Sequence, residues 1–203
     1  MNTTENNKLI AEFMGLKKYG YKDENYLVLS KHLSSEQLPY NTSWDWLMPV
    51  VKKCFNIDNE LAFDYLADEI LTLDIDETYK GIIEFIEDYI KQKTMTTENN
   101  KLIAEFMGGV ISTVPNLINL PQNRGDANIY SVKGSEVLPN GTYSVHRLNE
   151  LKYHDSWDWL IPVIENIDHL QHEPVMSIEN ALSTRSIDNT YKAVIEFIKE
   201  YNN

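Results

Sequence analysis

Residues 3–15 read TTENNKLIAEFMG, and the same thirteen residues return without a change at 96–108. A long exact repeat in one chain indicates an in-frame duplication of a structural unit. The sequence therefore predicts one small domain present twice, with copy one at 1–93 and copy two at 94–203. About 100 residues per copy are enough to bury a modest hydrophobic core.

Two further blocks recur in the same order. SWDWLMPV at 43–50 returns as SWDWLIPV at 156–163, and IDETYK at 75–80 returns as IDNTYK at 187–192. The distance between the two occurrences is 93 residues for the first block and 113 for the second. Copy two therefore carries about twenty additional residues, which we place in an insertion at 109–150.

All three blocks have helical patterns. In the first block Thr4 is a suitable N-cap and Gly15 a suitable terminator. In the third block the apolar residues keep to one helical face, and Asp74 and Ser186 are interchangeable N-caps. The central block begins after Ser43 or Ser156, and its proline should kink the helix or loosen its first turn.

Between these helices the pattern changes to that of strands. Residues 25–30 are short and apolar, and residues 174–178 contain β-branched side chains after a turn-rich stretch. The Asn140-Gly141 pair predicts a hairpin between 136–138 and 143–145. Each copy is thus predicted to be an α+β domain, in which three amphipathic helices cover a small sheet.

The NNKLIAEFMG start, the SWDWLxPV centre and the TYKxxIEFI end together resemble the phage ABA sandwich family. The resemblance covers about 40 residues of each copy. It implies a layered α/β/α sandwich in each copy and an origin in a phage or prophage, and it carries over no catalytic residues. The chain departs from the usual single-copy form by its duplication and by the insertion at 109–150.

The composition excludes several classes of function. Eighteen basic and 31 acidic residues give a net charge of −13, which disfavours duplex nucleic acid as a partner. The longest apolar runs are only a few residues, so we expect no membrane span and a cytoplasmic protein, in the host cell if it is viral. The single cysteine, Cys54, cannot form an intrachain disulfide.

The aromatic residues of the central block are the first candidates for a binding site. All four tryptophans of the chain lie there, two apart in each copy, and a tyrosine precedes each pair; these residues are Trp44, Trp46, Trp157, Trp159, Tyr40 and Tyr153. In one interpretation one ring packs into the core and the other covers the start of the helix. In the other, the paired rings form a surface that binds a ligand or a partner.

Positive charge gathers only in and near the insertion, where Arg124, Lys133 and Arg147 are further candidates for binding. A loop of this composition is either a recognition element or a linker between the copies. The cluster Asp168-His169-x-x-His172-Glu173 lacks a second ligand pair, so we predict no metal site. No phosphate-binding glycine loop or nucleophile elbow is present, and we predict neither a cofactor nor a catalytic residue.

These patterns favour a non-enzymatic binding module of a phage or prophage with two pseudo-symmetric copies. Such a module could act against host defence by holding a host protein or by sequestering a small nucleotide-like ligand. A structural or assembly role in a phage and an enzyme with a site between the copies are the alternatives. Association of the chain with itself stays open.

Overall fold

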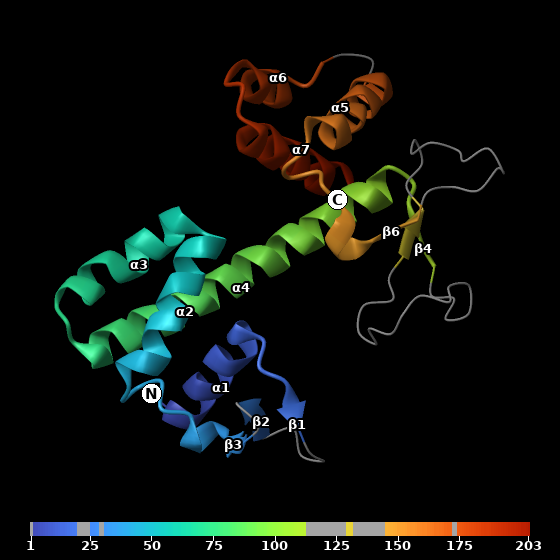
Figure 1. Cartoon of the computed structure of the whole chain (residues 1–203). Coiled ribbons are helices and arrows are strands. Elements are labelled where there is room, and N and C mark those ends of the chain that lie inside the picture. Colours follow the sequence, from blue (N-terminus) through green and yellow to red (C-terminus); the bar gives the residue numbers. More distant parts are fainter. Residues whose placement is uncertain (1, 20–24, 29–30, 113–128, 132–144, 172–173) are drawn as a thin grey trace. The chain divides into compact units, whose positions relative to one another are not determined.

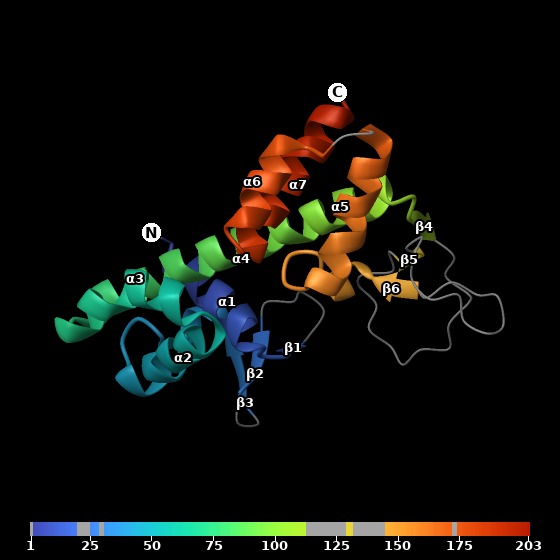
Figure 2. The same cartoon turned by 90° about the horizontal axis from the view of Figure 1, so that it is seen from above.

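The computed structural model describes residues 2–19, 25–28, 31–112, 129–131, 145–171 and 174–203 (Figures 1 and 2). The chain divides into two compact units, Met1–Gln92 and Lys93–Asn203, which we call unit one and unit two. The boundary between these units lies one residue before the boundary that the sequence repeat predicts. Each unit has its own cluster of buried side chains.

Unit one begins with a helix, continues through three short strands and ends in helices. Its elements are α1 (Thr3–Met14), β1 (Lys18–Tyr19), β2 (Asn25–Val28), β3 (Lys31–Ser34), the 3₁₀ turn η1 (Ser35–Gln37), α2 (Trp44–Ile57), α3 (Asn59–Leu71) and the first part of α4 (Ile75–Phe106). The strands form an antiparallel sheet in the order β1-β2-β3, with Tyr26 opposite Leu33. This sheet lies beside α1 at the edge of the unit (Figure 1).

Unit two repeats this order of elements. It contains the last part of α4, β4 (Val110–Ser112), β5 (Ile129–Ser131), β6 (Val145–Arg147), η2 (Leu148–Glu150), α5 (Trp157–Gln171), α6 (Met176–Ser183) and α7 (Ile187–Tyr201). Its antiparallel sheet has the order β4-β5-β6. The second copy of the repeated 3–15 segment is therefore not a separate helix, because α4 runs from the third block of copy one into the first block of copy two.

The predicted α+β fold with an α/β/α sandwich in each copy is wrong. The described structure is predominantly helical, and its strands are only two to four residues long. Most of the buried side chains that the structure describes in unit one come from helices, and Tyr26 is the one strand residue among those described. Strands this short cannot provide the central layer of a sandwich, so helices pack mainly against helices instead.

The predicted strand at 174–178 is also wrong, because Met176–Ser183 forms helix α6. Its apolar residues Val175, Ile178 and Leu182 follow a spacing of three to four residues, and Ile178 is fully buried in the core of unit two. Packing of this face therefore outweighs the local β preference of the segment. The matching region of copy one is helical as well, as α3.

The local signals at helix ends are mostly confirmed. Gly15 ends α1 with a left-handed φ of 76°, and Ser186 caps α7 by accepting a hydrogen bond from the backbone of Asn189. Thr4 is not the cap of α1, because Asn2 occupies that position and accepts from the Thr4 N–H. Ser43 stands at the N-cap of α2 without a side-chain cap bond, and α2 continues through Pro49. The predicted strand at 25–30 corresponds to β2, whereas the predicted Asn140-Gly141 hairpin lies outside the described residues.

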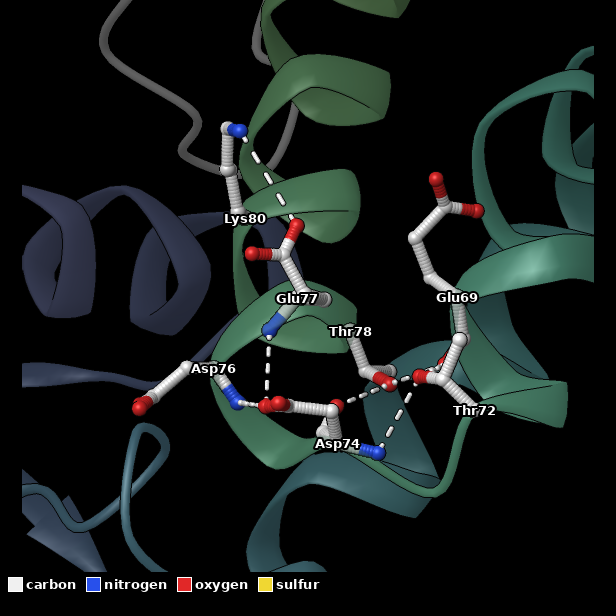
Figure 3. A network of polar contacts seen from close by, with 7 residues as sticks. All are labelled: Glu69, Thr72, Asp74, Asp76, Glu77, Thr78 and Lys80. Atoms are coloured by element: carbon white, nitrogen blue, oxygen red, sulfur yellow. Dashed lines mark hydrogen bonds and ion pairs between the residues drawn. The ribbon is translucent and has the colours of Figure 1, made fainter.

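The corner between α3 and α4 is held by a network of short polar contacts (Figure 3). Asp74 caps α4 by accepting two backbone N–H bonds of the first turn, at 2.9 and 3.3 Å. The Thr78 hydroxyl donates to the backbone carbonyls of Asp74 and Glu69, at 2.9 and 3.2 Å. Between Thr72 and Asp74, Leu73 adopts a left-handed φ of 56°. Arg185 has the same φ at the matching corner of unit two.

Candidate binding surfaces

In each unit a buried asparagine and a buried tyrosine hold the loop before the helix that begins with the tryptophan motif, α2 in unit one and α5 in unit two. Asn7 of α1 donates to the carbonyl of Leu38 at 2.7 Å and accepts from the hydroxyl of Tyr79 at 2.9 Å. Both side chains are buried. Burial raises the pKa of Tyr79 to about 12. The first helix, the loop and the last helix of the unit are thus joined at one point.

Unit two builds the same network with one additional group. Asn100 donates to the carbonyl of Leu151 at 2.8 Å and accepts from the Tyr191 hydroxyl at 3.0 Å. Its amide nitrogen also lies 3.0 Å from Nδ1 of His154. Because that amide nitrogen can only donate, Nδ1 is the acceptor in this contact. Copy one has Asn41 at the matching position.

The loop fixed by this network presents a tyrosine to the second tryptophan of the motif. The rings of Tyr40 and Trp46 meet edge to face with centroids 5.5 Å apart, and those of Tyr153 and Trp159 do so at 5.2 Å. Both tyrosines are buried and both tryptophans are half-buried against the core of their unit. These two tyrosines and two tryptophans, all of them predicted binding residues, therefore lie at the edge of the core of their unit.

The first tryptophan of the motif is exposed in unit two and half-buried in unit one. Trp157 is 36% exposed, and Ile161, one helical turn later, is 37% exposed. In unit one Trp44 is half-buried against the core, and Met48, again one turn later, is 44% exposed. Residues four apart share a helical face. We call these two pairs, Trp44 with Met48 and Trp157 with Ile161, the tryptophan strips.

The neighbours of the second tryptophan differ between the units. In unit two the ring of His146 meets Trp159 edge to face with centroids 4.9 Å apart. Copy one has Leu33 at the matching position. The Tyr153 hydroxyl is buried and has no hydrogen-bond partner among the described residues, and burial raises its pKa to about 12. Unit two thus has a histidine and an unpaired phenol beside a tryptophan that is otherwise placed as in unit one.

The basic residues predicted to bind a ligand are not placed at a site. Arg124 and Lys133 lie outside the described residues. Arg147 is the last residue of β6, and the description extends to its backbone only. Whether the insertion is a linker or a recognition element therefore stays a prediction.

The described residues contain no group of three histidine, cysteine or acidic side chains that could hold a metal ion. His172 and Glu173 of the sequence cluster lie outside them. The thiol of Cys54 is fully buried, and this burial raises its pKa to about 12. A buried, protonated thiol is a poor nucleophile, so Cys54 is a core residue of α2.

An acidic groove and an apolar face on α3 were not predicted as functional. Tyr65, Glu84, Glu87, Asp88 and Lys91 line a shallow open groove between α3 and α4. Burial, and after it the carboxylate of Asp88, raises the pKa of Tyr65. On another side of α3, Phe63 and Leu71 are exposed to solvent. For α3 the sequence signal was available, because residues 58–79 contain eight acidic residues and no lysine or arginine.

No family model, curated protein or solved structure matches this chain. The comparisons therefore give no support to the phage and anti-defence roles that the sequence resemblance implies. Among the helices of the described residues, none combines the length and the apolar composition that a membrane crossing requires.

Proposed function

We propose that the chain is a protein-binding module that uses the tryptophan strip of each copy as a docking surface. The observation that supports this proposal is a tryptophan with a second large apolar side chain at positions i and i+4 in both units. Both side chains are exposed in unit two, and in unit one Met48 is exposed beside the half-buried Trp44. Trp157 and Ile161 occupy the positions that Trp44 and Met48 occupy in unit one. Exposed tryptophan is enriched among the residues that dominate the energy of protein interfaces.

The second tryptophan of each motif anchors the start of the same helix to the core. Trp46 and Trp159 are wedged against buried tyrosines, and those tyrosines belong to the loops that Asn7 and Asn100 hold in place. A rigid supporting layer reduces the entropy that a side chain loses when it binds. The duplication then supplies two related docking surfaces in one chain, which can increase avidity when a partner also has two sites.

The charges near the strips favour a protein partner over a nucleotide. Asp45 and Asp158 each follow the first tryptophan, and Glu165 is exposed one turn beyond Ile161. Carboxylates beside an aromatic ring repel the phosphate groups of a nucleotide. A protein surface can meet the same ring with an apolar side chain and the acids with basic ones.

Selection from a displayed library of random peptides, with the full chain as bait, tests the proposal. Its matched control is the double variant Trp44→Ala/Trp157→Ala, in which both strips lose their aromatic ring. We expect selected peptides to contain aromatic or aliphatic anchors and to bind the double variant at least about tenfold more weakly. The proposal is contradicted if no peptide is enriched or if the selected peptides bind both proteins equally.

Equilibrium dialysis against ATP and GTP separates the nucleotide alternative. We expect no retention of either nucleotide above that of the double variant. Retention that depends on Trp44 and Trp157 would instead support a nucleotide-binding module.

A further inference from the structure

Helix α3 presents an apolar face to solvent. Phe63 is 63% exposed and Leu71 is 80% exposed, and they lie eight residues apart, so both project from the same side of the helix. Leu73 follows directly after the end of α3 and is 79% exposed. We call these three residues the α3 apolar face. Large apolar side chains with this exposure, close together on one element, are typical of a surface that meets a partner.

Leu73 has an energetically unfavourable backbone conformation. Its φ of 56° lies in the left-handed region, where a residue with a β-carbon is disfavoured by roughly 1 kcal/mol. Glycine is the residue that usually ends a helix in this conformation. The corner contacts of Thr72, Asp74 and Thr78 hold the turn, as Figure 3 shows. Leu73 therefore has a strained backbone, and its side chain is not buried in a way that would offset the strain.

Unit two shows that the fold does not require leucines at this corner. Ser183 and Arg185 occupy the positions of Leu71 and Leu73, and Arg185 has the same left-handed φ. Thr184 and Ser186 make the corresponding corner contacts with their hydroxyl groups. The same turn therefore forms with polar side chains, and the apolar residues are specific to unit one.

The charged residues of α3 itself and of the corner that follows it are all acidic. Residues 58–79 contain eight acidic residues and no lysine or arginine, whereas the matching residues 170–191 contain three acidic residues and one arginine. Glu60, Asp64 and Asp68 are exposed on α3 itself. Within the described part of the chain their carboxylates form no ion pair. A partner that brings basic groups to this face would supply the missing counter-charges.

We propose that the α3 apolar face is a docking site for a basic amphipathic helix of a partner protein. Apolar side chains of that helix would cover Phe63, Leu71 and Leu73, and its lysine or arginine side chains would pair with Glu60, Asp64 and Asp68. A second copy of this chain would bring the same negative charges against each other. Anionic membranes and nucleic acids carry charge of the same sign, so all three are disfavoured as occupants.

This docking site is separate from the tryptophan strips, since it lies on another helix and occurs in one unit only. The matched variant is Leu71→Ser/Leu73→Arg, which gives unit one the corner residues of unit two. Both side chains are exposed, so we expect its thermal unfolding midpoint to stay within a few degrees of that of the unchanged chain. The variant therefore removes two of the three side chains of the α3 apolar face without removing the fold.

The test is selection from a displayed library of helical peptides of unbiased charge, with the full chain as bait. We expect enriched peptides to have a net positive charge and apolar residues at i, i+3, i+4 and i+7. Their binding should weaken at least about tenfold in the Leu71→Ser/Leu73→Arg variant and also with rising salt. In the Trp44→Ala/Trp157→Ala variant it should be unchanged, so that failure of this inference and failure of the proposed function are distinguishable.

Three results would overturn the inference. The first is a selection that yields no peptide, neutral or acidic peptides, or peptides that bind the corner variant as tightly as the unchanged chain. The second is a dimer in sedimentation experiments that the corner variant loses, which would make a second copy the occupant. The third is binding to vesicles of phosphatidylglycerol that depends on Leu71 and Leu73, which would make a lipid surface the occupant.

Discussion

At the scale of single residues, the most consequential side chains are two polar ones that the cores enclose. Asn7 and Asn100 each hold a loop carbonyl and a tyrosine hydroxyl inside an otherwise apolar environment. A buried polar group contributes little net stability when it is paired, but an unpaired one is costly. These asparagines therefore fix the position of the loop more than they add to the core.

Replacement of Asn7 by alanine should destabilise unit one by about 2–4 kcal/mol, because the carbonyl of Leu38 and the hydroxyl of Tyr79 both lose their partner. The Cys54 thiol is buried and reacts only when unit one opens, so its labelling rate in native conditions measures the destabilisation. This labelling rate should rise roughly thirty- to a thousandfold. The exposed Asn56→Ala serves as control and should change the rate less than about threefold. Equal rates in the two variants would show that the network does not hold unit one together.

The two tryptophans of one motif should respond differently to truncation. Trp159→Ala should lower the free energy of unfolding by about 2–4 kcal/mol, because it removes the edge contacts with Tyr153 and His146. Trp157→Ala should cost about 1 kcal/mol or less, because its ring lies outside the core cluster. Urea unfolding of both variants compares the two values. A larger loss from Trp157→Ala would place the exposed ring in the core after all.

At the scale of elements, the corners before α4 and α7 show how side-chain contacts hold a turn that the backbone alone disfavours. Leu73 and Arg185 take the same left-handed conformation, and threonine and cap residues beside them accept or donate the local hydrogen bonds. The corner is therefore a property of the helix pair, and the residue in the left-handed position can vary.

Leu73→Gly should stabilise unit one by up to about 1 kcal/mol, since glycine adopts this φ without a steric penalty and little buried area is lost. The midpoint of urea unfolding measures the gain. Leu73→Ala keeps the β-carbon and should therefore show no such gain in stability. The same glycine variant should weaken binding at the α3 apolar face, so that stability and binding change in opposite directions. A loss of stability in Leu73→Gly would contradict the inference that the backbone at Leu73 is strained.

At the scale of the whole molecule, the two units form separate cores with the same plan and carry different surfaces. Unit one has an acidic, partly apolar α3, and unit two has a histidine beside its tryptophan motif and a serine and an arginine at the corresponding corner. Both cores enclose tyrosines next to their loops. The two units thus share the buried network and the tryptophan motif, and they differ at the α3 corner and at the residue beside the second tryptophan.

These buried tyrosines should make the molecule sensitive to alkali. Burial raises the pKa of Tyr40, Tyr79 and Tyr153 to about 12, above the value near 10 of an exposed phenol. Between pH 10 and pH 12 the unfolded chain releases protons that the folded chain keeps, so the free energy of unfolding should fall as pH rises. Urea midpoints from pH 8 to pH 11.5 measure this fall.

Tyr153→Phe is the matched variant for the alkaline loss. No residue in the described part of the chain pairs with its hydroxyl, so the variant should be as stable as the unchanged chain at pH 7, or slightly more stable. Above pH 10 its stability should fall less steeply, because one late-titrating phenol is gone. An identical slope in both proteins would show that Tyr153 is not protected in the folded state.

The sequence by itself determined the features that depend on neighbouring residues. The repeat, the helix ends at Gly15 and Ser186, and the acid-rich stretch before α4 can all be read from short segments. Helix caps act within one turn, and charge is a property of composition, so no distant contact is needed to recognise them.

Tertiary structure alone decided the rest. Residues 174–178 have β-branched side chains typical of a strand, but packing of Ile178 into the core of unit two makes the segment helical. The roles of Asn7 and Tyr79 depend on residues 72 positions apart, and the exposure of Trp157 or Leu71 depends on what packs around each helix. Burial is set by the meeting of distant segments, and no local pattern contains that information.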